Sequence, residues 1–330
     1  MKKIALLLFV LPFFYSCKED LKITHSGQTM GSYYTITYYH PEEVLTLNEI
    51  DSFLAVFNKS LSTWDSTSLI CQLNNAPRQF EPDSFFLAMY KKSKQVWELS
   101  NGLFDPSASP LFEAWGFGLK NAEKMDSAKV DSLKMYVGMD KSYLQGNTLL
   151  KSMPQVKFSF NAIAPGYAAD LLAQILLDKG VDNFLIDIGG EFASHGKKPD
   201  GNDWKVGIEK PVENPDSKNG TQAIITLKDN EALATSGNYR KFYYRDGKKY
   251  SHTINPKTGY PVSHNLLSAT IVAPDATTAD AYATTCMVMG LEGAKQFVAA
   301  QKGIKAYFIY DDGGKYGEFI TENLTKQLSK

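Results

Sequence analysis

Residues 168–191 read AADLLAQILLDKGVDNFLIDIGGE, and this stretch decides what fold the chain is expected to adopt. Its first half is rich in strong helix formers and ends at Lys179-Gly180, a typical helix stop. Its second half, residues 183–188, is a short apolar run that ends at two glycines, which is typical of a buried strand followed by a turn. A helix therefore leads directly into a strand near the middle of the chain.

Helices and strands alternate irregularly on either side of this stretch. Apolar residues at helical spacing predict helices over 45–61, 82–100, 276–289 and 294–300. Runs rich in β-formers predict strands over 29–39, 223–227, 266–272 and 305–310. The charged stretch 121–139 is expected to be an exposed helix and a turn. Because a strict β-α-β repeat is missing, we expect an α+β fold with mixed, largely antiparallel sheets and packed helices.

The composition narrows the class of protein. The chain has 330 residues, with Lys+Arg 35, Asp+Glu 36 and a formal net charge of −1. This balance argues against a general nucleic-acid binder, which needs a strongly basic surface. A hydrophobic share of 43% argues against a disordered chain, and the length suits one large domain or two closely packed ones. Cys71 and Cys286 form no CxxC pair, so neither structural zinc nor a disulfide framework is indicated, and Cys286 is expected to be buried.

The first 17 residues, MKKIALLLFVLPFFYSC, are typical of an export signal. Two lysines precede an apolar run that is too short to span a bilayer, and the run ends at Ser16-Cys17. Cys17 resembles the lipidated cysteine of bacterial lipoproteins, and an ordinary cleaved signal is the alternative. We therefore predict a signal peptide at 1–16, a lipid anchor on Cys17, a tether at 17–28 and one folded domain at 29–330. The expected location is a bacterial membrane, facing the periplasm, with the outer surface as an alternative.

Three features of the sequence are candidates for an active site. Asp280 and Thr284 are four apart on an expected helix, so their oxygens project from one face and suit Mg²⁺; a plain surface pair is the alternative. His252 lies in an expected loop, where it is either a general base or an ordinary loop residue. Gly189-Gly190 after the strand either lets a ligand approach the backbone or forms a tight turn.

Short motifs along the chain occur in a characteristic order. They are Met30-Gly31-Ser32, 61–66 (LSTWDS) with Leu73-Asn74, 102–106 (GLFDP), 110–118 (PLFEAWGFG), 161–170 (NAIAPGYAAD), 187–191 (DIGGE), 234–239 (ATSGNY), 251–256 (SHTINP) and 279–285 (ADAYATT). In this order they resemble the ApbE-type flavin transferases, which use FAD to attach FMN to a protein threonine. The resemblance extends from Met30 to about Gly290, which is most of the chain.

The resemblance implies a role for specific residues. It makes Asp280, Thr284 and the backbone carbonyl of Ala162 ligands of Mg²⁺, and His252 the general base. The residues that it places against FAD are Met30, Trp64, Leu103, Phe104, Asp105, Ser159, Pro165 and Ile254. Two of these depart from the family pattern, since Ser159 stands where the family usually has Asp, and Pro165 where it has Lys or Glu. Pro165 has neither an N–H group nor a charge, and Ser159 can only form a neutral hydrogen bond.

The implied reaction is Mg²⁺-dependent transfer of FMN from FAD to a threonine hydroxyl, with release of AMP. Acceptors are expected to carry an Asp-Gly-x-Ser/Thr-Gly-Ala-Thr segment and to be subunits of membrane redox complexes. One alternative is hydrolysis of FAD to FMN and AMP, with Asn74 as one candidate for the residue that selects between the two reactions. A second alternative is a lipid-anchored, flavin-binding protein without catalytic activity.

Overall fold

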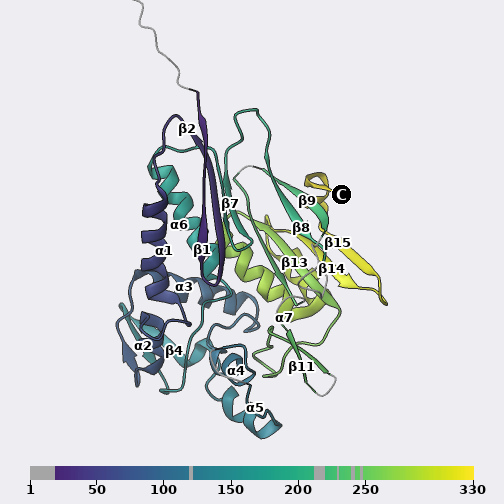
Figure 1. Cartoon of the computed structure of the whole chain (residues 1–330). Coiled ribbons are helices and arrows are strands. Elements are labelled where there is room, and N and C mark those ends of the chain that lie inside the picture. The colour runs from purple at the N-terminus through teal and green to yellow at the C-terminus, as the bar shows by residue number, and fades with distance from the viewer. Residues whose placement is uncertain (1–18, 119–121, 212–219, 229, 239–241, 246–247) are drawn as a thin grey trace, which may run out of the picture.

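A central antiparallel sheet of eight strands organises the chain (Figure 1). The computed structural model describes residues 19–118, 122–211, 220–228, 230–238, 242–245 and 248–330, so the predicted signal peptide, Cys17 and Tyr239 lie outside the described residues. The strands, in sheet order, are Leu21–Thr29 (β1), Ser32–His40 (β2), Phe184–Ile188 (β6), Glu191–His195 (β7), Ala232–Gly237 (β10), Leu266–Ala273 (β13), Lys305–Asp311 (β14) and Tyr316–Ile320 (β15).

One face of this sheet is covered by helices (Figure 1). Leu47–Leu61 (α1), Ala164–Asp178 (α6) and Ala276–Ala300 (α7) bury their apolar sides in the main core cluster. Successive side chains of each strand point to opposite faces of the sheet. Phe308 of β14 therefore belongs to this cluster, while Ile309 belongs to the cluster on the opposite face. The helix α1 starts at a capping box in which Thr46 and Glu49 satisfy each other's backbone N–H groups.

The opposite face is covered by a small second sheet. Its strands, in sheet order, are Leu328–Ser329 (β16), Thr221–Leu227 (β9) and Trp204–Glu209 (β8). Trp204, Val206 and Ile208 alternate along β8 and join the cluster that contains Tyr307 and Ile309 of the central sheet. The sheet is therefore buried on both faces, which explains why several of its strands are continuous apolar runs.

The remaining elements form a lobe at one end of the central sheet, and helix Ser84–Leu99 (α3) of this lobe contacts α7 (Figure 1). They are Leu69–Asn75 (α2), Gln79–Phe80 (β3), Ser84–Leu99 (α3), Ser109–Ala114 (α4), Ser127–Lys134 (α5), Met139–Lys141 (η1), Ser142–Gln145 (β4), Thr148–Lys151 (β5), Phe242–Arg245 (β11) and Lys248–Ser251 (β12); the 3-10 turn Glu322–Gln327 (η2) precedes β16. The indole N–H of Trp115 donates to the carbonyl of Gly259 at 2.8 Å, which joins the segment after α4 to the loop after β12. Both segments belong to a separate small cluster that includes Ile254.

The predicted α+β class and the main helices are confirmed. The predicted end of a helix at Gly290 is also confirmed, because Gly290 has φ 75° and breaks the helical path of α7 there. The strand predicted over 29–39 is confirmed as β2 from Ser32 onward, but its first residues are wrong, because Met30 and Gly31, with φ 53° and 72°, form the turn of a β1–β2 hairpin. Residues 21–28, expected to be a tether, belong to β1; an edge strand exposes half of its side chains, and its apolar pattern is therefore weak. In the part of the chain that is described, no helix is long and apolar enough to span a bilayer.

Candidate functional site

The helices α6 and α7 touch at Gly166, and this contact positions Asp280. The N–H group of Gly166 donates to Oδ2 of Asp280 at 3.1 Å. A Cβ atom on Gly166 would lie 2.3 Å from the carbonyl oxygen of Ala276, so only glycine lets the first turn of α6 pack this closely against α7. Asp280 is only 4% exposed, and its carboxylate is therefore held in a nearly dry place.

A second carboxylate fixes the start of α7. Asp170, on α6, accepts hydrogen bonds from the N–H groups of Ala276 at 2.8 Å and Thr277 at 2.9 Å, and from the Thr277 hydroxyl. These N–H groups belong to the first turn of the helix and have no acceptor within it. Burial, with the nearby charge of Asp170, raises the pKa of Asp280 to about 7, against the opposing effect of the Gly166 hydrogen bond.

Thr284, one turn further along α7, contacts the end of β10. Its Oγ1 lies 3.2 Å from Oγ of Ser236, and both side chains are half-buried. The register pairs Ala232 of β10 with Ala193 of β7, so Ser236 extends toward the β6–β7 turn formed by Gly189-Gly190. That turn adopts positive φ, 70° and 111°, and has the hairpin geometry that the glycine pair predicts.

The turn at Met30 lies at the same end of the sheet. Tyr34 of β2 pairs with Ile188 of β6, and a Cβ on Gly189 would come within 3.1 Å of the Ser32 hydroxyl. The side chains of Met30, Thr284 and Asp280 therefore come from elements that converge at one end of the central sheet.

The segment 159–165 leads into α6 and carries three of the predicted residues. The side chain of Asn161 donates to the Thr63 hydroxyl at 3.3 Å, which places the loop of Trp64 beside Ala162. Trp64 is 57% exposed, so its ring is free of the core and accessible to a flat ligand. Pro165 occupies the first turn of α6, where a missing N–H group costs no helical hydrogen bond.

Ser159 is held through the backbone, and Asn74 contributes to the same support. The N–H group of Ser159 donates to the carbonyl of Pro106 at 2.9 Å. The amide of Asn74 pairs with the backbone of Phe158, donating to its carbonyl at 2.8 Å and accepting from its N–H group at 2.7 Å. Asn74 therefore positions the strand-like segment that carries Ser159.

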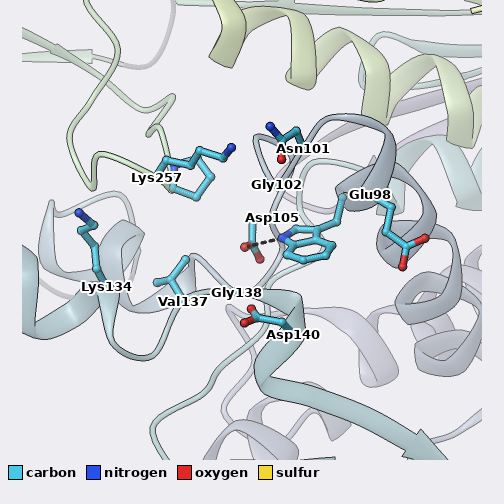
Figure 2. A pocket seen from close by; sticks show the side chains of 11 residues that line it. Glu98, Asn101, Gly102, Asp105, Lys134, Val137, Gly138, Asp140 and Lys257 are labelled. Atoms are coloured by element: carbon cyan, nitrogen blue, oxygen red, sulfur yellow. Dashed lines mark hydrogen bonds between the residues drawn. The ribbon is translucent and has the colours of Figure 1, made fainter.

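Asp105 lines a pocket of about 560 Å³ (Figure 2). Its carboxylate accepts hydrogen bonds from the Trp97 indole at 3.1 Å and from the N–H and hydroxyl groups of Ser107 at 2.8 and 2.6 Å. Burial raises the pKa of Asp105 to about 6, although these hydrogen bonds oppose the shift. The lining residues are Trp97, Glu98, Asn101, Gly102, Asp105, Lys134, Val137, Gly138, Asp140, Pro256 and Lys257. This described lining includes neither Asp280 nor Thr284, so the pocket adjoins the predicted flavin strip and does not contain the predicted metal ligands.

The side chains of Phe104 and Ile254 are buried in core clusters. The two residues as a whole are only 3% and 2% exposed, while Leu103 between Gly102 and Phe104 is half-buried. His252 follows β12 and is half-buried, with its ring edge-on to Phe117 at a centroid distance of 6.4 Å. His252 lies in the loop after β12, and the Trp115 indole hydrogen-bonds to Gly259 of the same loop.

The oxygens around Asp280 have the chemistry that suits Mg²⁺. In the described ranges, no three His, Cys, Asp or Glu side chains form a cluster that would hold a metal by themselves. The predicted donors are one carboxylate, one hydroxyl and one backbone carbonyl, which are hard ligands that do not suit zinc. Mg²⁺ commonly binds one or two carboxylates, and waters or substrate phosphates complete its shell, so the residues present fit this ion.

Three residues that position the site had no role assigned from the sequence. Gly166, Asp170 and Ser236 all lie inside quoted motifs, but their partners are distant in the chain. Ser236 could have been found from the period of a strand. Ala232, Ala234 and Ser236 share the face of β10 that packs on the helices, and Ser236 is the first polar side chain on that face.

The chain belongs to the ApbE family, whose profile matches residues 30–308, and it is an enzyme of the transferase class. A FAD:protein FMN transferase of Haemophilus influenzae is 32% identical over 311 residues, which cover 89% of this chain and 88% of that protein. The FAD:protein FMN transferase of Escherichia coli K12 is 32% identical over 342 residues, which cover 97% of this chain and 95% of that protein.

Solved structures agree with the fold. The flavin transferase ApbE from Vibrio cholerae matches with a TM-score of 0.82 at 29% identity, covering 93% of this chain and 99% of that one. The apo form of the flavinyl transferase ApbE from Pseudomonas stutzeri also matches with a TM-score of 0.82, at 30% identity, covering 96% and 98%.

Proposed function

We propose that this protein transfers FMN from FAD to a threonine hydroxyl of an acceptor protein, in an Mg²⁺-dependent reaction that releases AMP. The observation that carries the proposal is the convergence of Asp280, Thr284 and the Ala162 loop at one end of the sheet, next to Met30 and Trp64. The names of the curated relatives support the transfer of FMN from FAD to a protein.

The bonds that form and break follow from the two products. The threonine oxygen of the acceptor attacks the phosphorus on the FMN side of FAD, and a new oxygen–phosphorus bond forms. The bond from this phosphorus to the bridging oxygen breaks, and AMP leaves with that oxygen. Such transfers depend mainly on positioning and on charge neutralisation. Mg²⁺ held by Asp280, Thr284 and the carbonyl of Ala162 would supply that neutralisation at the diphosphate.

The protein's own residues perform the remaining tasks. His252 accepts the proton of the attacking hydroxyl, because a neutral imidazole is the common general base near neutral pH. Trp64 offers its exposed ring to the isoalloxazine. The strip Leu103-Phe104-Asp105 and Ile254 contact the rest of FAD. Ser159 contributes a neutral hydroxyl, while Pro165 contributes the shape of the first turn of α6.

The decisive assay combines the purified protein with FAD, Mg²⁺ and an acceptor that carries Asp-Gly-x-Ser/Thr-Gly-Ala-Thr. The expected result is covalent flavin fluorescence on the acceptor together with AMP. Free FMN without labelled acceptor would instead identify a FAD pyrophosphatase, and unchanged FAD would identify a binding protein.

A histidine variant tests the general base. His252→Ala should bind FAD normally but transfer FMN about 10²–10⁴ times more slowly, which is the usual contribution of a general base. His40→Ala is the matched control, because His40 ends β2 at the opposite end of the strand from Met30. Equal transfer rates in His252→Ala and wild type would remove His252 from the mechanism.

We also propose that the protein is exported and held at a bacterial membrane by lipid on Cys17, with the folded domain facing the periplasm. The sequence of residues 1–17 supports this assignment. A shared membrane plane would raise the effective concentration of membrane-bound acceptors. Mass spectrometry of the protein extracted from membranes should show a diacylglyceryl group on Cys17, and an unmodified N-terminus at another residue would contradict the proposal.

A further inference from the structure

The last side chain of β10 on the face that packs against the helices is a hydroxyl, that of Ser236. Ala232 and Ala234 face the helices and are buried in the main core cluster, while Leu233 between them belongs to the cluster on the other face. The alternation of a strand therefore turns Ser236 toward α7. Small side chains in this row let α7 lie close to the strand, and a third alanine would satisfy the packing equally well. Packing alone does not explain a hydroxyl at position 236.

The hydroxyl of Ser236 meets the hydroxyl of Thr284, with 3.2 Å between the two oxygens. A neutral hydroxyl that offers a lone pair to a cation must direct its hydrogen away from that cation. The oxygen of Ser236 can accept this hydrogen, which would leave the lone pairs of Thr284 free to face the same side as Asp280, one helical turn earlier. Groups that orient metal ligands in this way commonly matter for metal affinity.

We infer that Ser236 is a positioning residue that orients the Thr284 hydroxyl for binding of a divalent cation. The inference rests on the proposed function, because it requires a cation at Asp280 and Thr284 during the reaction. It adds a residue of β10 to a site whose predicted ligands come from α7 and from the loop before α6.

Cation binding tests the inference directly. Mn²⁺ is titrated into the protein in the presence of FAD and without acceptor, and free Mn²⁺ is followed by electron paramagnetic resonance. Ser236→Ala should weaken Mn²⁺ binding about five- to tenfold, which is the scale of one lost hydrogen bond to a ligand. Ser236→Thr keeps the hydroxyl and should bind Mn²⁺ within about twofold of wild type.

A matched control lies on the same strand. Thr235 faces the other side of the sheet and forms a comparable hydroxyl pair with Thr270 of β13, at 2.9 Å. Thr270→Val removes that pair and should leave Mn²⁺ affinity unchanged. Ser236→Cys, which has nearly the same volume as serine but a weak acceptor, should behave like Ser236→Ala and provides a second test if the alanine variant unfolds.

The possible results separate two failures. If wild type binds Mn²⁺ and both Ser236→Ala and Ser236→Cys bind it equally well, the role of Ser236 is refuted while the proposed function stands. If wild type itself binds no Mn²⁺ in the presence of FAD, the metal-dependent function is refuted first. An equal loss in Thr270→Val would show a general effect of the strand and would also overturn the inference.

Discussion

Gly166→Ala tests whether the close contact between α6 and α7 positions the site. The added Cβ would lie 2.3 Å from the carbonyl oxygen of Ala276 and 2.9 Å from Cβ of Asp280. Ordinary contact needs about 3.4 Å, so the two helices must separate by roughly 1 Å at this point. Overpacking of this kind costs about 1–3 kcal/mol. The better helix propensity of alanine returns at most about 1 kcal/mol, and with that full return the net loss is about 0–2 kcal/mol.

The functional effect of this substitution should exceed its effect on stability. A shift of about 1 Å moves Asp280 relative to the Ala162 carbonyl, and misplacement of that size can reduce a reaction rate about 10²-fold. The measurements are urea unfolding and the rate of FMN transfer at saturating Mg²⁺. The control is Gly207→Ala on β8, where the nearest atom lies 3.6 Å from the added Cβ and neither quantity should fall. A Gly166→Ala protein with wild-type stability and rate would refute the argument that only glycine fits there.

Two further substitutions examine the carboxylates. Asp280→Asn keeps an acceptor for the Gly166 N–H group and removes a buried charge, so the melting temperature should be unchanged or higher. FMN transfer should fall at least about 100-fold, because a metal ligand is lost. A clearly lower melting temperature would contradict this reasoning. The pKa of Asp105 is raised from 3.8 to about 6, so the folded state binds this proton more tightly than the unfolded state does. As pH rises from 3.8 to about 6, the free energy of unfolding should therefore fall by at most about 3 kcal/mol. In Asp105→Asn the fall between urea titrations at pH 4.5 and pH 7 should be smaller by the Asp105 contribution, because Asp280, whose pKa is also raised, still contributes. An unchanged pH dependence would show that Asp105 is not a group responsible.

The sequence predicted the elements whose signals are local. Helical spacing of apolar residues located α1, α3, α6 and the two parts of α7, and the glycine at 290 located the break between those parts. Local patterns were weaker for edge strands and for short strands of the small lobe. The hairpin of β1 and β2 was missed because half of the side chains of β1 face solvent, and because Met30, which adopts positive φ, is not a typical turn residue.

Motif order supplied the list of candidate residues, but it did not show how each one would act. Phe104 and Ile254 were expected to contact FAD, and the structure buries both residues, which are only 3% and 2% exposed. Asn74 was considered as a residue that selects between reactions, and the structure shows its amide engaged with the backbone of Phe158. Both outcomes depend on how the side chain is buried, and a motif carries no information about burial.

The division between sequence and tertiary structure follows the range of the forces involved. The sequence alone determined that Asp280 and Thr284 share one helical face, because the period of a helix relates residues four apart. Only the tertiary structure decided that Gly166 reaches Asp280 across 114 residues, and that Ser236 meets Thr284 across 48. Those contacts depend on strand register and on the closest distance at which two helices can pack, and both are set by the whole core at once.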